Sequence, residues 1–200
     1  MSTVTARRSS AENLTERSGT ARERLLKAAD ELFYAEGINT VGIDRVIERA
    51  GVAKASLYSA FGSKDGLIRA YLLHRHELRK ARIQRHLAKH VEPKARMLAL
   101  FDALDELITG PLWRGCPFIA ATGEARTDDT VNEVAAITRA YTRQCFVDEA
   151  VALGLADPGA LAGQLVLLYD GAVVAAQVLD RTAAARARAI AELVIDSAPR

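Results

Sequence analysis

A break between two short helical patterns, at Gly51, constrains the fold of this 200-residue chain more than any other feature. The apolar residues before the break recur at helical spacing, and a second short helix is predicted from Val52 to Phe61. The first apolar set consists of Ile43, Val46, Ile47 and Ala50. Because glycine tolerates a positive φ, the second helix is expected to leave at a steep angle to the first. The pattern therefore predicts a helix-turn-helix.

The predicted second helix has one inward face and one polar face. Leu57 and Phe61 lie four residues apart and are expected to pack into the core. The outward side chains are a cation, two hydroxyls, a phenol and a methyl group, in Lys54, Ala55, Ser56, Tyr58 and Ser59. Small and hydrogen-bonding side chains suit a helix that lies in a DNA groove.

These residues resemble the DNA-binding signature of TetR/AcrR-family transcriptional regulators. The resemblance is carried by Gly37, Ile43, the run from Ala50 to Tyr58, Phe61, Ser63, Lys64 and Leu67. It implies an all-α protein of about nine helices, in which a three-helix helix-turn-helix domain precedes a helical ligand-binding and dimerisation bundle. The remainder of the chain resembles the family only in its length and helical texture.

The resemblance also implies roles on the DNA, residue by residue. Tyr58 and Lys64 match family positions that hold backbone phosphates, although Tyr58 could instead be a half-buried packing residue. The side chains best placed for base edges are those of Lys54, Ala55, Ser56 and Ser59. Ala53, at the helix start, is expected nearest the groove floor.

Two positions depart from the family pattern. Gly42 stands where Ser or Thr usually begins the middle helix, and glycine is a weaker N-cap. Asp44 stands where many members place a residue that contacts bases or phosphates. Arg45, beside it, is the candidate substitute for that contact.

Charge is divided unevenly along the chain. Residues 1–96 contain 19 Lys and Arg against 11 Asp and Glu, a net +8, whereas residues 97–200 contain 8 against 14, a net −6. A basic front suits binding to a polyanion, although a chance distribution of solvated charges is the alternative. The two cysteines and the absence of a signal-like N-terminus predict a cytoplasmic protein without a disulfide.

Three regions are predicted: a disordered basic arm over 1–18, a DNA-binding domain over 19–65, and a sensing and dimerisation domain over 66–200. The arm could reach the minor groove or remain a loose tail. A capping box of Thr20 and Glu23 opens the first helix. Later helices are expected over 63–90, 93–110, 117–126, 128–153, 157–179 and 182–195. Ser63, Asp157 and Thr182 are the expected N-caps of the helices that they begin.

The stretch from Leu161 to Leu179 has a single formal charge, Asp170. A membrane span is disfavoured because that carboxylate lies at its centre, among glycines. A helix that is apolar on every face needs protein on every face, which predicts a C2 homodimer joined by a four-helix bundle and a palindromic operator. The predicted interface residues are Leu161, Leu165, Val173, Ala176, Ala187, Ile190 and Val194.

A cavity for an unknown and largely apolar effector is predicted in the second half. Its candidate lining residues are Phe101, Leu104, Trp113, Cys116, Phe118, Tyr141, Cys145, Tyr169 and Asp170, each of which could instead be plain core. Asp170 could bind the ligand, Arg139, Arg143 or a partner chain. Cys116 could be a redox sensor or an inert thiol. His86 and His90 have metal-ligand spacing, but a basic solvated face is favoured and no metal or cofactor is predicted.

The sequence predicts a DNA-binding transcriptional regulator, and we expect a repressor that a small molecule releases from its operator. It contains no Gly-rich phosphate loop and no Gly-x-Ser-x-Gly motif, so an enzyme is not expected. Two alternatives stay open. One is an all-helical small-molecule-binding protein or enzyme that does not bind DNA, and the other is a constitutive architectural DNA binder.

Overall fold

The computed structural model of the chain describes residues 19–125, 129–178 and 180–200. Within these ranges every regular element is an α-helix, which confirms the predicted fold class. The helices are α2 (Ala21–Glu36), α3 (Ile43–Ala50), α4 (Lys54–Phe61), α5 (Lys64–Leu87), α6 (Pro93–Thr109), α7 (Pro117–Glu124), α8 (Asp129–Ala152), α9 (Pro158–Gln177) and α10 (Ala183–Ser197). The predicted arm over 1–18 lies outside the described residues.

The chain divides into two compact units, one up to Tyr71 and one from Leu72 onward. The division falls inside α5, whereas the sequence analysis placed the boundary after residue 65. A single helix therefore begins in the first unit and continues through the second.

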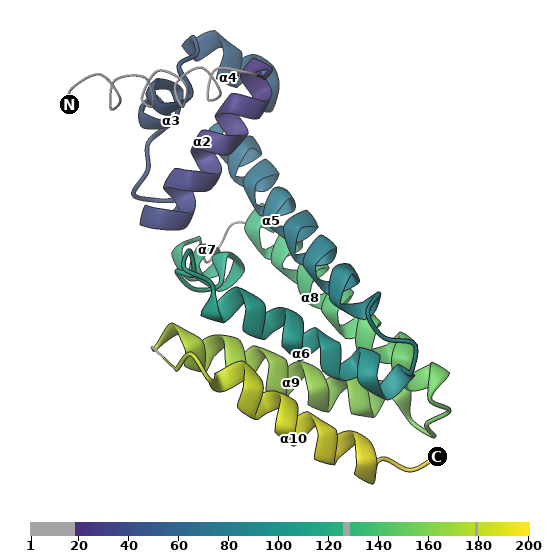
Figure 1. Cartoon of the computed structure of the whole chain (residues 1–200). Coiled ribbons are helices and arrows are strands. Elements are labelled where there is room, and N and C mark those ends of the chain that lie inside the picture. Colours follow the sequence, from purple (N-terminus) through teal and green to yellow (C-terminus); the bar gives the residue numbers. More distant parts are fainter. Residues whose placement is uncertain (1–18, 126–128, 179) are drawn as a thin grey trace, which may run out of the picture. The chain divides into compact units, whose positions relative to one another are not determined.

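In the first unit, α2 packs against both α3 and α4 (Figure 1). The predicted capping box is present, since Thr20 Oγ1 accepts from Glu23 N at 3.2 Å and Glu23 Oε2 accepts from Thr20 N at 2.7 Å. The core includes Phe33, whose ring meets that of Tyr71 edge-on at 5.5 Å between centroids. Leu57, on α4, is fully buried against this core.

The turn between α3 and α4 has the predicted glycine geometry. Gly51 adopts φ 62° and ψ 46°, and Val52 N donates to Ile47 O at 3.3 Å. Ala53 is extended and is the N-cap, so α4 begins at Lys54 rather than at Val52 as predicted. Val52 and Ala53 lie in the turn where the chain changes direction, so neither of them can yet be part of the helical conformation of α4.

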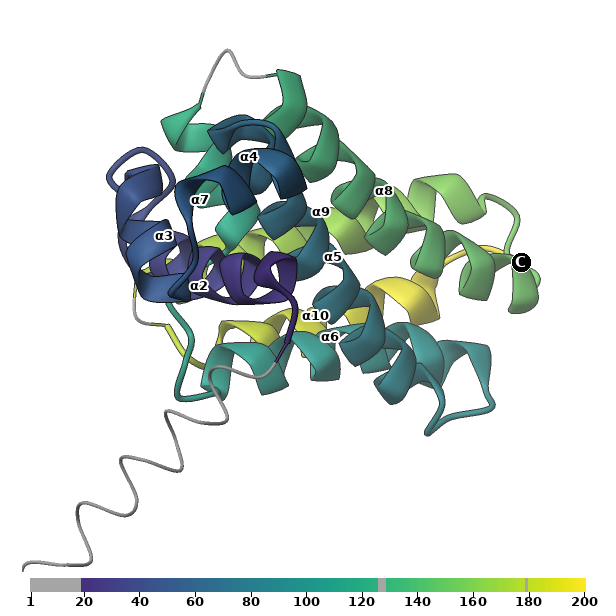
Figure 2. The same ribbon diagram turned by 90° about the horizontal axis from the view of Figure 1, so that it is seen from above.

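In the second unit, α6 and α9 each contact α8 and α10, and they contact each other (Figures 1 and 2). α7 packs on α8. The rings of Phe101, Phe146 and Tyr169 cluster at the centre, with centroids 5.7–6.5 Å apart. α9 is long and apolar enough to cross a bilayer by length and composition, but its packing against three helices is that of a core helix.

Helix ends in the second unit follow local chemistry with one correction. Asp157 Oδ1 accepts from Ala160 N at 2.9 Å, so the predicted cap of α9 is confirmed. Thr182 precedes α10, but its side chain makes no capping bond. Its Oγ1 donates to Asp180 Oδ1 at 2.9 Å.

Candidate nucleic-acid interface and ligand hollow

The outer face of α4 is the candidate nucleic-acid interface. Lys54, Ala55 and Ser59 are exposed, Ser56 is half-buried, and Tyr58 is 47% exposed, so that its hydroxyl is free of the core. Ala53 is exposed directly before the helix. The short helix therefore presents hydroxyl, phenol, ammonium and methyl groups together on one side.

Phe61 corrects one expectation about α4. It was predicted as core, yet it is only half-buried, while Leu57 is fully buried. The Arg22 guanidinium lies over the Phe61 ring, 5.1 Å from its centroid. Phe61 occupies the last position of α4, where the helix leaves the core, and the cation covers the ring in place of apolar neighbours.

Two candidate DNA-contacting cations are paired with carboxylates in the free protein. Arg45 donates to both carboxylate oxygens of Glu36, at 2.7 and 2.9 Å. This bond lowers the pKa of Glu36 and raises the pKa of Arg45. Lys54 Nζ donates to Asp44 Oδ1 at 3.1 Å, which raises the pKa of Lys54. Both pairs are solvent-exposed, so water or phosphate can exchange with the carboxylates at low cost.

Lys64 opens α5, beside a capped helix N-terminus. Ser63 Oγ accepts from Gly66 N at 3.0 Å, as the sequence predicted. The first amides of α5 and the ammonium of Lys64 together form a positive end that suits a backbone phosphate. Lys64 is half-buried, so its aliphatic stem is held while its charge reaches solvent.

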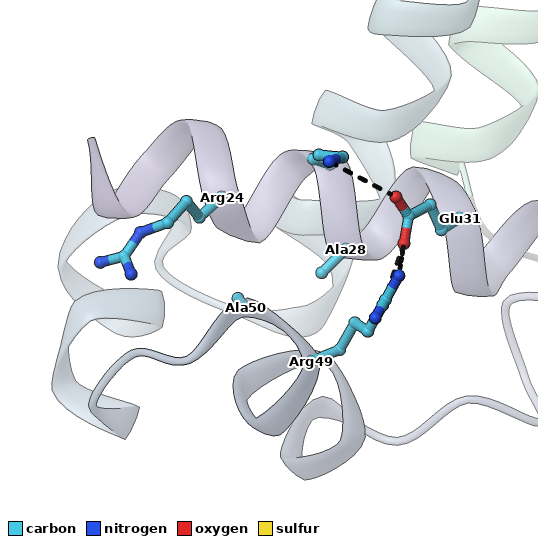
Figure 3. Close-up of a pocket in the computed structure, with 6 residues that line it drawn as sticks. Arg24, Ala28, Glu31, Arg49 and Ala50 are labelled. Carbon is cyan, nitrogen blue, oxygen red and sulfur yellow. Dashed lines mark hydrogen bonds and ion pairs between the residues drawn. The ribbon is translucent and has the colours of Figure 1, made fainter. Parts of the chain in front are cut away.

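A small dent lies between α2 and α3, lined in part by Arg24, Ala28 and Ala50 (Figure 3). Its volume of about 30 Å³ has room for roughly one water molecule. Across it, Arg49 Nη2 pairs with Glu31 Oε2 at 2.8 Å. This pair links the two helices, and it could not be predicted from the sequence because the residues lie on different elements.

The second unit contains a hollow of about 350 Å³. It is lined by Arg79, Cys116, Phe118, Ile119, Thr122, Ala135, Thr138, Arg139, Asp170 and Val173, from α5, the start of α7, α8 and α9. Three predicted pocket residues, Cys116, Phe118 and Asp170, are among them. Arg79 was not predicted to line a pocket, because an arginine on a basic helix face is expected to be solvent-exposed.

A second hollow, of about 340 Å³, shares Cys116 and Ile119 with the first. Trp113, another predicted pocket residue, lines it together with Gln177 and Arg181. Cys116 and Cys145 are both buried, and neither forms a disulfide.

Five predicted pocket residues lie elsewhere. Phe101, Leu104 and Tyr169 are at most 1% exposed and belong to the packed centre of the bundle. Tyr141 Oη accepts from Gln84 Nε2 at 2.7 Å, on the side of α8 that meets α5. Cys145, one turn along α8, is buried there, and burial raises the pKa of its thiol. Large aromatic residues signal burial in the sequence, but they do not distinguish a filled core from the wall of a hollow.

Asp170 pairs with one of the two arginines that the sequence offered as partners. Arg139 Nε donates to Asp170 Oδ2 at 2.9 Å. Arg143 instead donates from Nη2 to the carbonyl of Gly159, at 3.3 Å. His86 is also corrected, because it is buried rather than solvated and its Nε2 lies 2.6 Å from Glu106 Oε2.

Most of the residues predicted for the dimer face are buried within the single chain. Five of its seven residues are already buried within the single chain: Leu161, Leu165, Val173, Ala176 and Ala187. Only Ile190 and Val194 keep exposed surface. The large apolar residues exposed on these helices are Leu167, Val174, Val178, Ile190 and Leu193. The uniform apolarity of α9 gave no pattern from which to tell its two faces apart.

Comparison with known proteins agrees with this arrangement. The family model for bacterial regulatory proteins of the tetR family matches residues 25–71. The crystal structure of SCO4454, a TetR-family transcriptional regulator from Streptomyces coelicolor, is 30% identical with a TM-score of 0.82, over 90% of this chain and 96% of that one.

Two curated relatives match the N-terminal part. The transcriptional activator FasR of Mycolicibacterium smegmatis is 32% identical over 87 residues, 44% of this chain. The transcriptional repressor BdcR of Escherichia coli is 43% identical over 47 residues, 24% of this chain. These alignments span 40% and 24% of the relatives' own lengths. With SCO4454 matched over nearly its full length, the chain belongs to the TetR family of transcriptional regulators.

Proposed function

We propose that this regulator is a cytoplasmic repressor that binds a palindromic operator as a homodimer and releases it when a small molecule occupies the second unit. The observation that carries the proposal is the exposed polar face of α4, which follows the αL turn at Gly51. On that face Lys54, Ser56 and Ser59 read base edges, and Tyr58 holds phosphate.

The phosphate contacts extend beyond α4. Lys64 and the N-terminus of α5 bind one phosphate group. Arg45 adds a further contact once phosphate displaces Glu36. Each cation that neutralises a phosphate releases counterions, so the affinity is expected to fall steeply with salt.

Dimerisation is supported by an exposed stripe on α9. Leu167, Gly171, Val174 and Val178 recur at alternating spacings of four and three residues, which is the seam of a two-helix packing. A Cβ placed on Gly171 would meet no atom within 4 Å, so a facing helix has room to approach closely. With Leu193 of α10 beside it, this stripe suits a four-helix bundle made by two copies.

Regulation is proposed to act through α5, which belongs to both units. A ligand in the second unit changes the packing of the later part of α5, and the first turns of the same helix carry Lys64. Such a ligand lowers operator affinity only if it binds the DNA-free arrangement more tightly than the DNA-bound one. Repression is the proposed sign, as in the relative BdcR.

Selection from random double-stranded DNA tests this function. The full chain is expected to enrich an inverted repeat, and a gel-shift titration should show one dimer per repeat. Ser59→Glu places a negative charge on the exposed face of α4 and should abolish binding through repulsion from phosphate. Ser197→Glu adds the same charge at the end of α10 and should leave binding unchanged.

Enrichment of no inverted repeat, or equal loss in both variants, would overturn the proposal. Binding of any duplex regardless of its sequence would indicate an architectural DNA binder instead. A reporter gene downstream of the enriched repeat then decides the sign, because a repressor lowers expression and an activator raises it.

A further inference from the structure

The 350 Å³ hollow of the second unit has an imbalance of charge. Its charged lining residues are Arg79, Arg139 and Asp170. Asp170 already accepts from Arg139, so this pair neutralises itself. Within the described part of the chain, Arg79 pairs with no carboxylate. Its Nη2 lies 3.7 Å from Cys116 Sγ, and its guanidinium lies 5.1 Å from the centroid of the Phe118 ring.

A second arginine reinforces this positive charge from one helical turn further along α5. Arg82 Nε is buried and has no hydrogen-bond partner in the structure. Burial lowers the pKa of its guanidinium, and the neighbouring charge of Arg79 lowers it further. Both arginines act electrostatically on the buried hydroxyl of Tyr169. Two like charges three residues apart on one helix face repel each other. An anion bound beside them would offset this repulsion.

The carboxylate that acts electrostatically on Arg82 is already engaged. Glu106 attracts Arg82 electrostatically, but its two oxygens are bonded to Arg85 and His86. The side of the hollow that carries Arg79 therefore lacks an anion of its own.

The other residues that line the hollow offer a ligand mainly hydrocarbon surface. Phe118, Ile119 and Val173 supply hydrocarbon surface. The hydroxyls of Thr122 and Thr138 donate back to carbonyls of their own helices, so their protons are not offered to a ligand. A volume of about 350 Å³ lies within the range of small-molecule sites.

We propose that this hollow binds a small organic anion, whose apolar body lies against Phe118, Ile119 and Val173 and whose carboxylate is held by Arg79. The guanidinium fork matches a carboxylate with two parallel hydrogen bonds, and Arg82 adds positive potential from behind. The inference refines the effector of the proposed function, and it rests on that function only for the regulatory consequence of binding.

Calorimetric titration of the DNA-free full chain tests the ligand class. The probes are 2-naphthoate beside 2-naphthamide, and octanoate beside octanamide, so each pair differs only in the acid group. At least one carboxylate is expected to bind about tenfold more tightly than its amide at low salt, and the advantage should shrink as salt increases. The amide keeps the apolar contacts but offers no charge to Arg79.

Three variants locate the effect. Arg79→Gln should reduce the advantage of the carboxylate to less than about twofold, whereas Arg79→Lys should retain part of it because the charge remains. Lys80→Gln removes the next cation along α5, which contacts Glu77 and Tyr141 rather than the hollow, and should change nothing. Circular dichroism confirms that each variant is folded before titration.

The proposal is overturned if neither carboxylate binds more tightly than its amide, or if the advantage survives Arg79→Gln. Operator binding is measured separately by gel shift, without ligand. Loss of that binding would count against the proposed function and not against the ligand class. A carboxylate that binds but leaves the gel shift unchanged would support the site and contradict its coupling to DNA.

Discussion

The two units of the chain differ in where some of their charged groups lie. In the first unit the ion pairs Arg45–Glu36, Arg49–Glu31 and Lys54–Asp44 all lie at the surface. In the second unit Glu149 is 7% exposed and accepts from Arg96 Nε at 2.8 Å, and Arg79 faces a hollow. Exposed ion pairs exchange their partners with water and suit binding to a polyanion, whereas a half-buried cation beside a hollow suits a small anionic ligand.

The exposed stripe of α9 gives the prediction with the largest expected effect, because the second unit is proposed to carry the dimer interface. Leu167→Glu should convert a dimer into a monomer, since a carboxylate buried without a partner costs several kcal/mol. Light scattering coupled to size exclusion would measure the mass. Gln164→Glu lies one turn away on the same exposed face at a polar position and should weaken the dimer less. A Leu167→Glu protein that stays dimeric would move the interface elsewhere.

Leu57 tests whether the first unit depends on its small core as much as on its surface. Leu57→Ala should lower the free energy of unfolding by about 3 kcal/mol, because it deletes a fully buried side chain of α4. Urea titration followed by circular dichroism would measure this loss. Ser59→Ala, on the exposed face of the same helix, should change stability by less than about 0.5 kcal/mol. Equal losses in the two variants would contradict the assigned orientation of α4.

Elements fixed by neighbouring residues could be predicted from the sequence. The Thr20 and Glu23 capping box, the αL conformation of Gly51 and the Asp157 cap each depend on residues at most four apart. The family signature coincides with these local features. This is why the helix-turn-helix could be identified to within two residues of its observed bounds.

Features that depend on packing between distant segments could not be predicted in the same way. The Glu31–Arg49 pair and the placement of Arg79 beside Cys116 each require knowledge of which helices meet. The inward and outward faces of α9 could not be told apart for a related reason. Leu165 faces inward and Leu167 outward, yet the two residues are identical in type and lie in the same apolar run.

Lys64 tests whether the first unit contacts DNA phosphates as proposed. Lys64→Ala should lower operator affinity about tenfold and reduce the slope of log affinity against log salt by about one, as expected for the loss of one phosphate contact. Gel-shift titrations at several salt concentrations would measure both. Lys80→Gln removes a cation from the second unit and should leave the slope unchanged. An unaltered slope in Lys64→Ala would remove this lysine from the interface.

The acid sensitivity of the second unit should depend in part on Glu106. Its hydrogen bond to His86 and the nearby charges of Arg85 and Arg82 lower its pKa in the folded protein. A carboxyl whose folded pKa is depressed stabilises the fold fully above its unfolded pKa, and this stabilisation is lost as the pH falls through the folded pKa. Glu106→Gln should therefore cost about 1 kcal/mol at pH 6 and much less at pH 3.5, a modest value because the side chain is 46% exposed.

Urea unfolding at the two pH values would measure this difference. Glu192→Gln is the matched control, because Glu192 pairs with Lys94 at the surface of the same unit at 3.3 Å. A Glu106→Gln penalty that is the same at both pH values would show that the lost group acts by packing rather than by charge.

The smallest expected effect concerns Asp44, which holds Lys54 in the free protein. Asp44→Asn should raise operator affinity by a few-fold at low salt, because Lys54 no longer exchanges a carboxylate for phosphate and one repulsive charge leaves the interface. The gain should disappear at high salt, where exposed charges are screened. Asp65→Asn is the control, because it removes an acidic residue from the first turn of α5, where the carboxylate interacts favourably with the helix dipole. An equal gain of affinity in Asp65→Asn would show that only the net charge matters. A gain confined to Asp44→Asn would show that the exposed pairs of the first unit restrain its cations before DNA arrives.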